Sequence, residues 1–282
     1  MKKQLIAITL IWISATYVIG QSNEILVPVS DPTKRGKLKV DIHYGSITVK
    51  GLPRKDVSVK YVSGEDDERD DKSSLPTLGR RTDNEKTSSN KDGLKKIAGG
   101  SLDLEISEDK NEVTVESSSW SKKLNLTIEV PSGFDLNLST YNDGDVVVSN
   151  IQGSIEISAY KGSIMAENVS GSVLADSYNG EIKITFDKIT EGTPMSFSTY
   201  NGDIDLTFPA TLKASLKMKT EQGEVLSSFD MNVTRNGPIQ KKEAKGGVYK
   251  VVVDEWVKGD VNGGGPEFTL KNYNGNIIIR KK

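Results

Sequence analysis

The chain has 282 residues, a length that suits two average domains or one repetitive all-β domain. It carries 37 Lys and Arg against 39 Asp and Glu, so it lacks the excess of positive charge that gathers nucleic acid, and we expect no nucleic-acid partner. Cysteine is absent and the one histidine is His43, which excludes disulfide frameworks, thiolate metal sites and cysteine nucleophiles and leaves little acid–base chemistry near neutral pH.

Residues 1–20 have the features of a secretory signal peptide. Lys2 and Lys3 precede an apolar run that ends in Val18-Ile19-Gly20. The run spans about 15 residues, short of the roughly 20 that a membrane-spanning helix needs, and an uncleaved anchor is the alternative. Cleavage after Gly20 removes two lysines and moves the net charge from −2 to −4. We therefore predict an exported chain, in the periplasm, at the cell surface or outside the cell, with no stable membrane insertion.

A nine-residue period organises the centre of the chain. Five glycines recur at this spacing, and a β-branched apolar residue follows each glycine by two positions, with a further apolar residue two positions later. Apolar pairs at spacing two are typical of a strand with one buried face. The glycines are Gly144, Gly153, Gly162, Gly171 and Gly180, and the first apolar residues are Val146, Ile155, Ile164, Val173 and Ile182.

Short strands separated by corners cannot bury an apolar face alone, but they can when they stack. We predict that two nonapeptides form one rung of about 18 to 22 residues, and that each strand pairs in parallel with its equivalent one rung away, at about 4.8 Å. The predicted fold class is all-β, a parallel β-solenoid (β-helix) that forms a single domain over residues 21–282. Glycine at a corner suits a positive φ, and four asparagines beside the corner glycines tolerate the same region: Asn142, Asn179, Asn201 and Asn274.

Two segments interrupt the strand pattern. Residues 64–100 open with the acidic tract Glu65–Asp71 and contain few large apolar residues, so burial would not offset the entropy of ordering them. We predict a mobile insertion there, with a cation-binding tract as the alternative. Residues 232–247, which contain Lys241, Lys242 and Lys245, predict a second loop.

Several motifs resemble a known family. They are the run Leu124–Pro131, the repeated Tyr-Asn-Gly-Asp-Ile corners, the segment Met195–Leu206 and the segment Val261–Pro266. These motifs are similar to those of the bacterial putative-adhesin family, exported β-solenoid proteins of unassigned biochemical role. The resemblance covers residues 36–282 apart from the two interruptions. It implies a cell-envelope or surface protein with no known catalytic residues, and no functional residue carries over.

Candidate chemical sites have ordinary explanations. Calcium-binding β-rolls place an aspartate two residues after the glycine, where this chain has valine or isoleucine. The segment Asn262–Glu267 lacks the Lys-Ser/Thr of a phosphate-binding loop and precedes a strand. Asp203 and Asp205 alternate around Ile204 and should point outward together, which a polysaccharide-cleaving β-helix could use. His43 has no paired carboxylate motif and is expected at the surface. Because each of these candidates has an ordinary explanation, we predict no catalytic, cofactor-binding or metal-ligating residues.

Tyrosines recur at the corners with the spacing of a rung. Tyr160 and Tyr178 are 18 residues apart, and Tyr141 and Tyr200 hold the equivalent corners before and after them. The four rings should therefore stack about 4.8 Å apart. Aliphatic residues hold the same place in the alternate nonapeptides, so we predict that the rings are largely buried corner fillers. A platform for sugar rings is the alternative.

Three functions fit these features. The first is a non-catalytic, adhesin-like interaction or scaffold protein of the envelope or surface, which binds an envelope protein or a surface glycan and needs no cofactor. The second is a carbohydrate-binding or polysaccharide-cleaving β-helix, which requires an acidic or aromatic groove on an external face. The third is a periplasmic scaffold or signalling component. We predict the first, and hence a protein that is not an enzyme.

Overall fold

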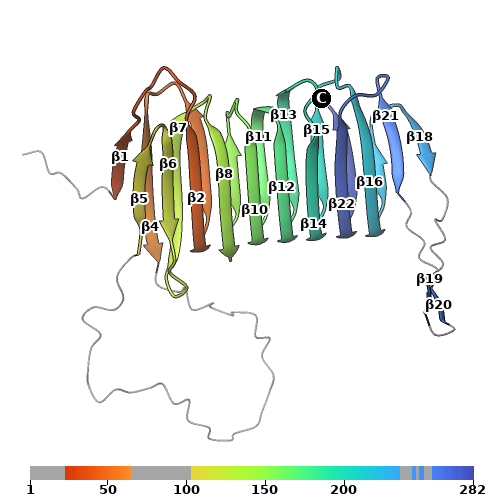
Figure 1. Cartoon of the computed structure of the whole chain (residues 1–282), viewed down its shortest axis with the longest axis horizontal. Helices are drawn as coiled ribbons and strands as arrows, with labels where there is room; N and C mark the ends of the chain where they lie inside the picture. Colours follow the sequence, from red (N-terminus) through yellow and green to blue (C-terminus); the bar gives the residue numbers. More distant parts are fainter. Residues whose placement is uncertain (1–22, 65–102, 236–242, 246–247, 251–255) are drawn as a thin grey trace, which may run out of the picture.

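The computed structural model describes residues 23–64, 103–235, 243–245, 248–250 and 256–282 (Figure 1). Within these ranges every regular element is a β-strand, and the strands build two large sheets that lie one over the other. Among the described residues no helix is both long and apolar enough to cross a membrane. The predicted signal peptide lies outside the described residues, as does the predicted insertion beyond Gly64, which ends strand β4.

The two large sheets contain all the strands but two. The first sheet runs, in spatial order, through β1 (Glu24–Pro28), β4 (Asp56–Gly64), β7 (Lys123–Pro131), β3 (Ile47–Leu52), β9 (Val146–Ser149), β11 (Ile164–Gly171), β13 (Ile182–Ile189), β15 (Ile204–Phe208), β23 (Ile277–Lys281) and β17 (Val225–Ser227). The second sheet runs through β18 (Met231–Arg235), β21 (Val257–Val261), β16 (Ala214–Gln222), β22 (Glu267–Asn274), β14 (Met195–Asn201), β12 (Val173–Asn179), β10 (Ile155–Lys161), β8 (Asp135–Asn142), β2 (Lys37–Tyr44), β6 (Glu112–Ser117) and β5 (Glu105–Asp109). The remaining strands, β19 (Glu243–Lys245) and β20 (Val248–Lys250), pair antiparallel with each other.

The nine-residue repeat alternates between the two sheets. β10 pairs in parallel with β12 and places Ile155 opposite Val173, while β11 pairs in parallel with β13 and places Ile164 opposite Ile182. Partners are thus one predicted 18-residue rung apart. Each nonapeptide supplies one strand, and one strand from each sheet makes a rung, as the periodicity predicts.

The spatial order of the rungs departs from chain order at both ends of the stack. The rung β22–β23 lies between β14–β15 and β16–β17, and the rung β2–β3 lies between β6–β7 and β8–β9. Phe268 of β22 sits opposite Met195 of β14 on one side and Leu216 of β16 on the other, so its insertion gives it an apolar neighbour on both sides. Parallel rungs in chain order therefore extend only from β8 to β15.

Antiparallel strands cover the ends of the stack. β4 pairs antiparallel with β7 and β5 with β6 at one end, and β21 pairs antiparallel with β16 at the other. β18 pairs with β21 and extends to Arg235. The prediction of a loop over residues 232–247 is therefore wrong for its first residues, which belong to this strand. Residues 236–242 and 246–247 of that loop lie outside the described residues.

The core lies between the two sheets. Inward and outward residues alternate along each strand, as in β7, where every second side chain is buried. Ile164 of β11, Phe197 of β14 and Phe208 of β15 are fully buried. The period-two pattern of the sequence therefore predicts the buried face correctly.

Most of the repeating corner positions must be glycine because neighbouring rungs come very close together there, and not because the backbone has a positive φ. Of the five repeating glycines only Gly171 has a positive φ, of 148°. A Cβ at Gly162 would lie 2.0 Å from the carbonyl oxygen of Gly144, and a Cβ at Gly180 would lie 2.0 Å from that of Gly162. The four neighbouring asparagines, which would tolerate a positive φ, do not adopt one: Asn142, Asn179, Asn201 and Asn274.

Candidate functional site: an exposed aromatic row

Five tyrosines occupy equivalent positions on five adjacent strands of the second sheet. Each tyrosine is the penultimate residue of its strand, in β8, β10, β12, β14 and β22. These strands end along the lower margin of the molecule in Figure 1. We call these residues the tyrosine row: Tyr141, Tyr160, Tyr178, Tyr200 and Tyr273.

The five rings stack face to face and are exposed. Successive ring centroids lie 4.6 to 5.0 Å apart, with interplanar angles of 3 to 10°. The predicted stacking at rung spacing is therefore confirmed. Each tyrosine is between 38 and 46% exposed, so the prediction that the rings are largely buried corner fillers is wrong.

The residue before each tyrosine explains why the ring points outward. This preceding residue is buried in all five strands and takes the inward position. In four of the five strands it also hydrogen-bonds to a glycine carbonyl on a neighbouring rung, as where Thr140 Oγ1 donates to Gly45 at 2.8 Å and Asn272 Nδ2 donates to Gly202 at 2.8 Å; the fifth is Ala159. Alternation then places the tyrosine on the outer face. The buried Ile151, whose position suggested a buried tyrosine, follows β9 of the first sheet and so belongs to a different type of corner.

Stacking determines which part of each tyrosine is accessible. A ring between two parallel neighbours at about 5 Å has both faces covered, so its exposed surface is the ring edge and the hydroxyl group. A second ladder runs beside the row, where Asn201 Nδ2 donates to Asn179 Oδ1 at 2.6 Å and Asn274 Nδ2 donates to Asn201 Oδ1 at 3.4 Å. The tyrosine row is therefore a rigid strip of ring edges and hydroxyls.

The row extends past Tyr141 to two further rings that the sequence did not reveal. His43 lies between Ile42 and Tyr44, which are in register with β8, so it holds the tyrosine position in β2. Trp120 packs on His43 with a centroid distance of 4.3 Å and meets Tyr141 at 5.4 Å with an interplanar angle of 74°. The indole is 62% exposed. Trp120 lies between strands, where no periodic pattern could have pointed to it.

His43 is held in place by a backbone group as well as by the indole. Its Nδ1 lies 3.2 Å from the carbonyl oxygen of Ser117, which can only accept, so Nδ1 carries the proton. The imidazole is partly buried under Trp120. The prediction of a surface histidine without a carboxylate partner is consistent with this placement, in which His43 supports Trp120.

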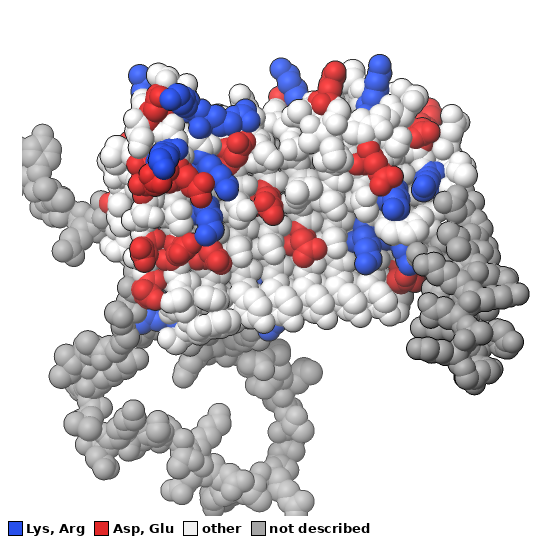
Figure 2. All heavy atoms as spheres, viewed as in Figure 1, with Lys and Arg blue, Asp and Glu red and all other residues white. Residues whose placement is uncertain are grey.

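Charged side chains are sparse along the row but not absent from it, because Asp176 is exposed two positions before Tyr178 on β12. Figure 2 shows a largely uncharged band along the lower margin, where the strands of the second sheet end, with scattered acidic side chains above it and more charges toward the two ends of the stack. Serine residues share the outer face with the tyrosines two positions earlier on β10 and β14, at Ser158 and Ser198. The accessible strip thus combines tyrosine and serine with few charges.

The two aspartates expected on the outer face, Asp203 and Asp205, are both bonded within the sheet. Asp205 is only 8% exposed, and its carboxylate accepts from Arg280 through Nε at 2.7 Å and Nη2 at 2.9 Å. This ion pair raises the pKa of Arg280. Asp203 Oδ1 accepts the backbone N–H of Asn276 at 2.7 Å. Asp205 does lie on the outer face, between the inward Ile204 and Leu206, but Arg280 on the neighbouring strand β23 binds and covers its carboxylate.

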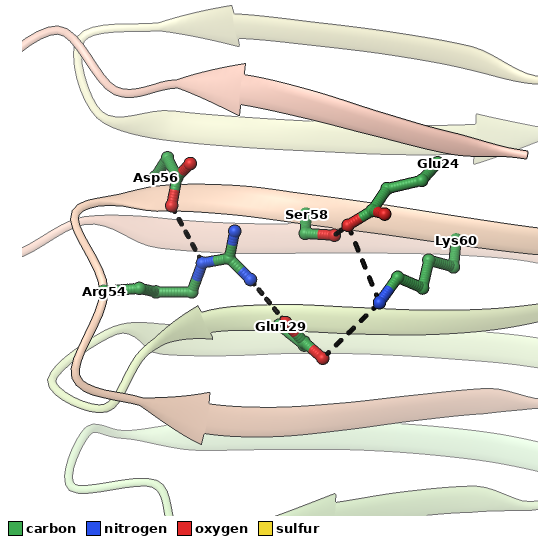
Figure 3. Close-up of polar contacts among 6 residues, drawn as sticks. All are labelled: Glu24, Arg54, Asp56, Ser58, Lys60 and Glu129. Atoms are coloured by element: carbon green, nitrogen blue, oxygen red, sulfur yellow. Dashed lines mark hydrogen bonds and ion pairs between the residues drawn. The ribbon is translucent and has the colours of Figure 1, made fainter. Parts of the chain in front are cut away.

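A cluster of charges on the outer face of the first sheet holds the terminal strands together (Figure 3). Arg54 bonds Asp56 at 2.8 Å and also donates to Glu129 of β7. Glu24 of β1 accepts from the Ser58 hydroxyl of β4 at 2.6 Å. The Ser58 hydrogen bond lowers the pKa of Glu24, and the hydrogen bond from Arg54 lowers that of Asp56. These partners lie within the cluster, so its role is structural.

Metal-binding geometry is absent from the part of the chain that the structure describes. No group of three or more histidine, aspartate or glutamate residues in those ranges is placed to hold a metal ion. At the corners the carboxylates cap backbone groups instead, as where Asp145 Oδ1 accepts the N–H of Ser163 at 2.7 Å.

Comparison with known proteins finds similarities for part or most of the chain. Residues 135–262 match the family model described as Toastrack DUF4097. A solved structure described as a putative cell adhesion protein from Clostridium sporogenes is 11% identical with a TM-score of 0.48, and the match covers 93% of this chain and 100% of that one. A putative adhesin from Bacteroides fragilis is 12% identical with a TM-score of 0.29, covering 92% and 96%. No curated protein matches. Residues 135–262 are thus similar to the Toastrack DUF4097 family, which supports over this part of the chain the resemblance that the sequence motifs indicated.

Proposed function

We propose that this chain is an exported, non-catalytic, adhesin-like protein, a single β-solenoid domain of residues 21–282 that binds a partner of the cell envelope or surface. The partner is an envelope protein or a surface glycan. The observation that supports the proposal is the tyrosine row, five exposed rings held in one line at 4.6 to 5.0 Å.

The tyrosine row has the properties of a contact surface. Tyrosine supplies a large amphipathic area with few rotatable bonds and is enriched in interfaces, as it is beside serine in antibody binding sites. Stacking has already fixed the ring orientations in the free protein, so a partner does not have to order them. Preorganisation of this kind improves affinity because less conformational entropy is lost on binding.

The same geometry supports binding over catalysis. Cleavage of a polysaccharide requires two carboxyl groups facing a shared space at a defined separation. Asp205 is mostly buried and bonded to Arg280, and Asp203 is bonded to a backbone amide. The acids that suggested hydrolysis therefore stabilise strand pairing, and a carbohydrate is left as a ligand rather than a substrate.

Localisation decides between a surface adhesin and a periplasmic scaffold or signalling component. The predicted signal peptide supports export but does not indicate whether the exported protein stays in the periplasm or reaches the cell surface. Protease added to intact producing cells should digest the protein if it lies on the surface. Survival of the protein until the outer barrier is opened would place it in the periplasm and favour the scaffold.

Binding of the purified exported protein to envelopes of the producing cells tests the proposal. We expect the double variant Tyr160→Ser/Tyr178→Ser to bind at least tenfold more weakly than the unmodified protein. The control is Met165→Ser, because Met165 is 37% exposed on β11 of the other sheet and lies away from the row. Circular dichroism should show that all the variants are folded. Equal binding by the row variant and the unmodified protein would rule out the row as the contact surface.

A further inference from the structure

The tyrosine row contains few free aromatic faces, and this limits how it can bind a sugar. Pyranose rings pack their C–H groups flat against an aromatic face, whereas the inner rings of the row offer only edges and hydroxyls. A glycan that needs a ring face must therefore bind where the stack ends.

Trp120 provides that face. His43 and Tyr141 occupy equivalent positions on adjacent strands, so both contact the indole from the same side of the sheet. The tilted stack on His43, at 4.3 Å and 30°, covers one face of the indole, while 62% of the residue remains exposed. We infer from this exposure that the face turned away from His43 is accessible, while the contacts with His43 and Tyr141 hold the indole in place.

A polar hollow lies at the corners beside this end of the row. Its volume is about 410 Å³, within the range of small-molecule sites. Asp143 comes two residues after Tyr141, Lys161 directly follows Tyr160 and Lys123 comes three residues after Trp120, so the hollow lies within a few residues of this end of the row along the chain. Its polar side chains are Ser46, Lys123, Asn125, Asp143, Asp145 and Lys161.

The charges of the hollow favour a neutral, hydroxyl-rich ligand. Two lysines and two aspartates line it, and one pair, Lys123 and Asp143, forms an ion pair at 3.1 Å. Because its positive and negative charges balance, the hollow attracts neither a polyanion nor a polycation. Its carboxylates can accept from sugar hydroxyls, and its ammonium and amide groups can donate to them.

We propose that the ligand of this protein is a neutral glycan, which stacks one pyranose ring on the free face of Trp120 and places its hydroxyl groups in the hollow formed around Lys123, Asp143 and Lys161. This site deepens the proposed function on which it rests. The tyrosine row continues away from it and offers hydroxyl groups to further sugar units along the chain of the glycan.

An array of neutral hexose and N-acetylhexosamine oligosaccharides, with acidic glycans beside them, tests the site on the purified exported protein. We expect binding to neutral oligosaccharides, a loss of at least tenfold in affinity for Trp120→Ala, and a smaller loss for Trp120→Phe, which keeps an aromatic face. Asp143→Asn should also weaken binding. The matched control is Leu174→Ala, because Leu174 is 47% exposed on β12 of the same sheet and lies outside the site.

The outcomes separate this inference from the proposed function. Trp120 is exposed, so Trp120→Ala should keep the melting temperature within a few degrees, and a loss of binding then reports on the site. Unchanged affinity of Trp120→Ala, or binding to acidic glycans alone, would overturn the inference. Envelope binding that depends on Tyr160 and Tyr178 without any binding to glycans would refute the inference and leave the proposed function standing, with a protein partner. Binding to neither envelopes nor glycans would refute both.

Discussion

Adjacent residues on one strand lie in opposite environments, and this gives a direct test of the register. Ile164 is fully buried and faces Val146 and Ile182 on the neighbouring strands, whereas Met165 is 37% exposed. Ile164→Asp places an unpaired carboxylate in the core and should lower the free energy of unfolding by more than about 3 kcal/mol. Met165→Asp should cost less than about 1 kcal/mol. Urea unfolding of both variants measures the difference, and equal losses would contradict the register.

The exposed tyrosines also contribute to stability through their faces. Tyr178 stacks on Tyr160 and Tyr200, each at a centroid distance of 5.0 Å. Each such pair is worth about 0.5 to 1.5 kcal/mol, so Tyr178→Ala should destabilise the protein by about 1 to 3 kcal/mol. Tyr178→Phe keeps the ring and should cost less than about 0.5 kcal/mol. Chemical denaturation measures both, and a Phe variant as unstable as the Ala variant would show that the hydroxyl, not the stack, matters.

Single residues show what the sequence could and could not predict. The rung spacing of the tyrosines predicted their stacking, because the period of the sequence and the period of the sheet are the same. Their exposure was missed because it depends on which of two adjacent corner residues turns inward, and Thr140 takes that position through its hydrogen bond to Gly45. Trp120 was missed because it joins the row from an irregular segment.

The corner glycines lie where the packed rungs leave no room for a side chain. Gly180 approaches the Gly162 carbonyl so closely that a Cβ would lie 2.0 Å from the oxygen. Because this oxygen belongs to the backbone, the clash could be relieved only by moving a whole rung. Gly180→Ala should therefore cost more than about 2 kcal/mol. Gly133 has open space around it and no positive φ, so Gly133→Ala should be neutral or stabilise by up to about 1 kcal/mol. Thermal unfolding compares the two, and a harmless Gly180→Ala would contradict the close packing of the rungs.

The terminal strand β1 should respond to acid. Ser58 and Lys60 hold the pKa of Glu24 below its ordinary value of 4.5, so this contact stabilises β1 fully above that value and is lost as the pH falls through the lowered pKa. Amide-exchange protection factors in β1 should fall in acid before those of the central strands. Glu24→Gln should remove much of this pH dependence. Protection in β1 that stays constant down to the pH of global unfolding would show that the contact contributes little.

The positions of the strands were easier to predict from the sequence than the order in which the strands pair. The alternation of apolar residues identifies the strands of β8 to β15 and their parallel partners because the repeat is local. The insertion of β22–β23 between earlier rungs depends on Phe268 finding apolar partners in both β14 and β16. No pattern within one strand encodes that choice, so the sequence predicted the rung but not its place.

At the scale of the whole molecule, the stack converts a short repeat into a long, ordered surface. Inward residues of both sheets form the core, and the same register places one tyrosine on each of five adjacent strands at the margin of the second sheet. The surface is therefore as rigid as the sheet beneath it. The composition excluded kinds of site and the nine-residue period predicted the fold class, whereas the position of the contact surface required the structure.

Hydroxyl-radical footprinting of the tyrosines, read by mass spectrometry, tests the central claim that the tyrosine row is an exposed contact surface. In the free protein Tyr141, Tyr160, Tyr178, Tyr200 and Tyr273 should all be oxidised readily. On envelopes of the producing cells the same residues should become protected, while Met165 on the opposite sheet keeps its reactivity. Rings that resist oxidation in the free protein, or that stay equally reactive when the protein is bound, would contradict the account.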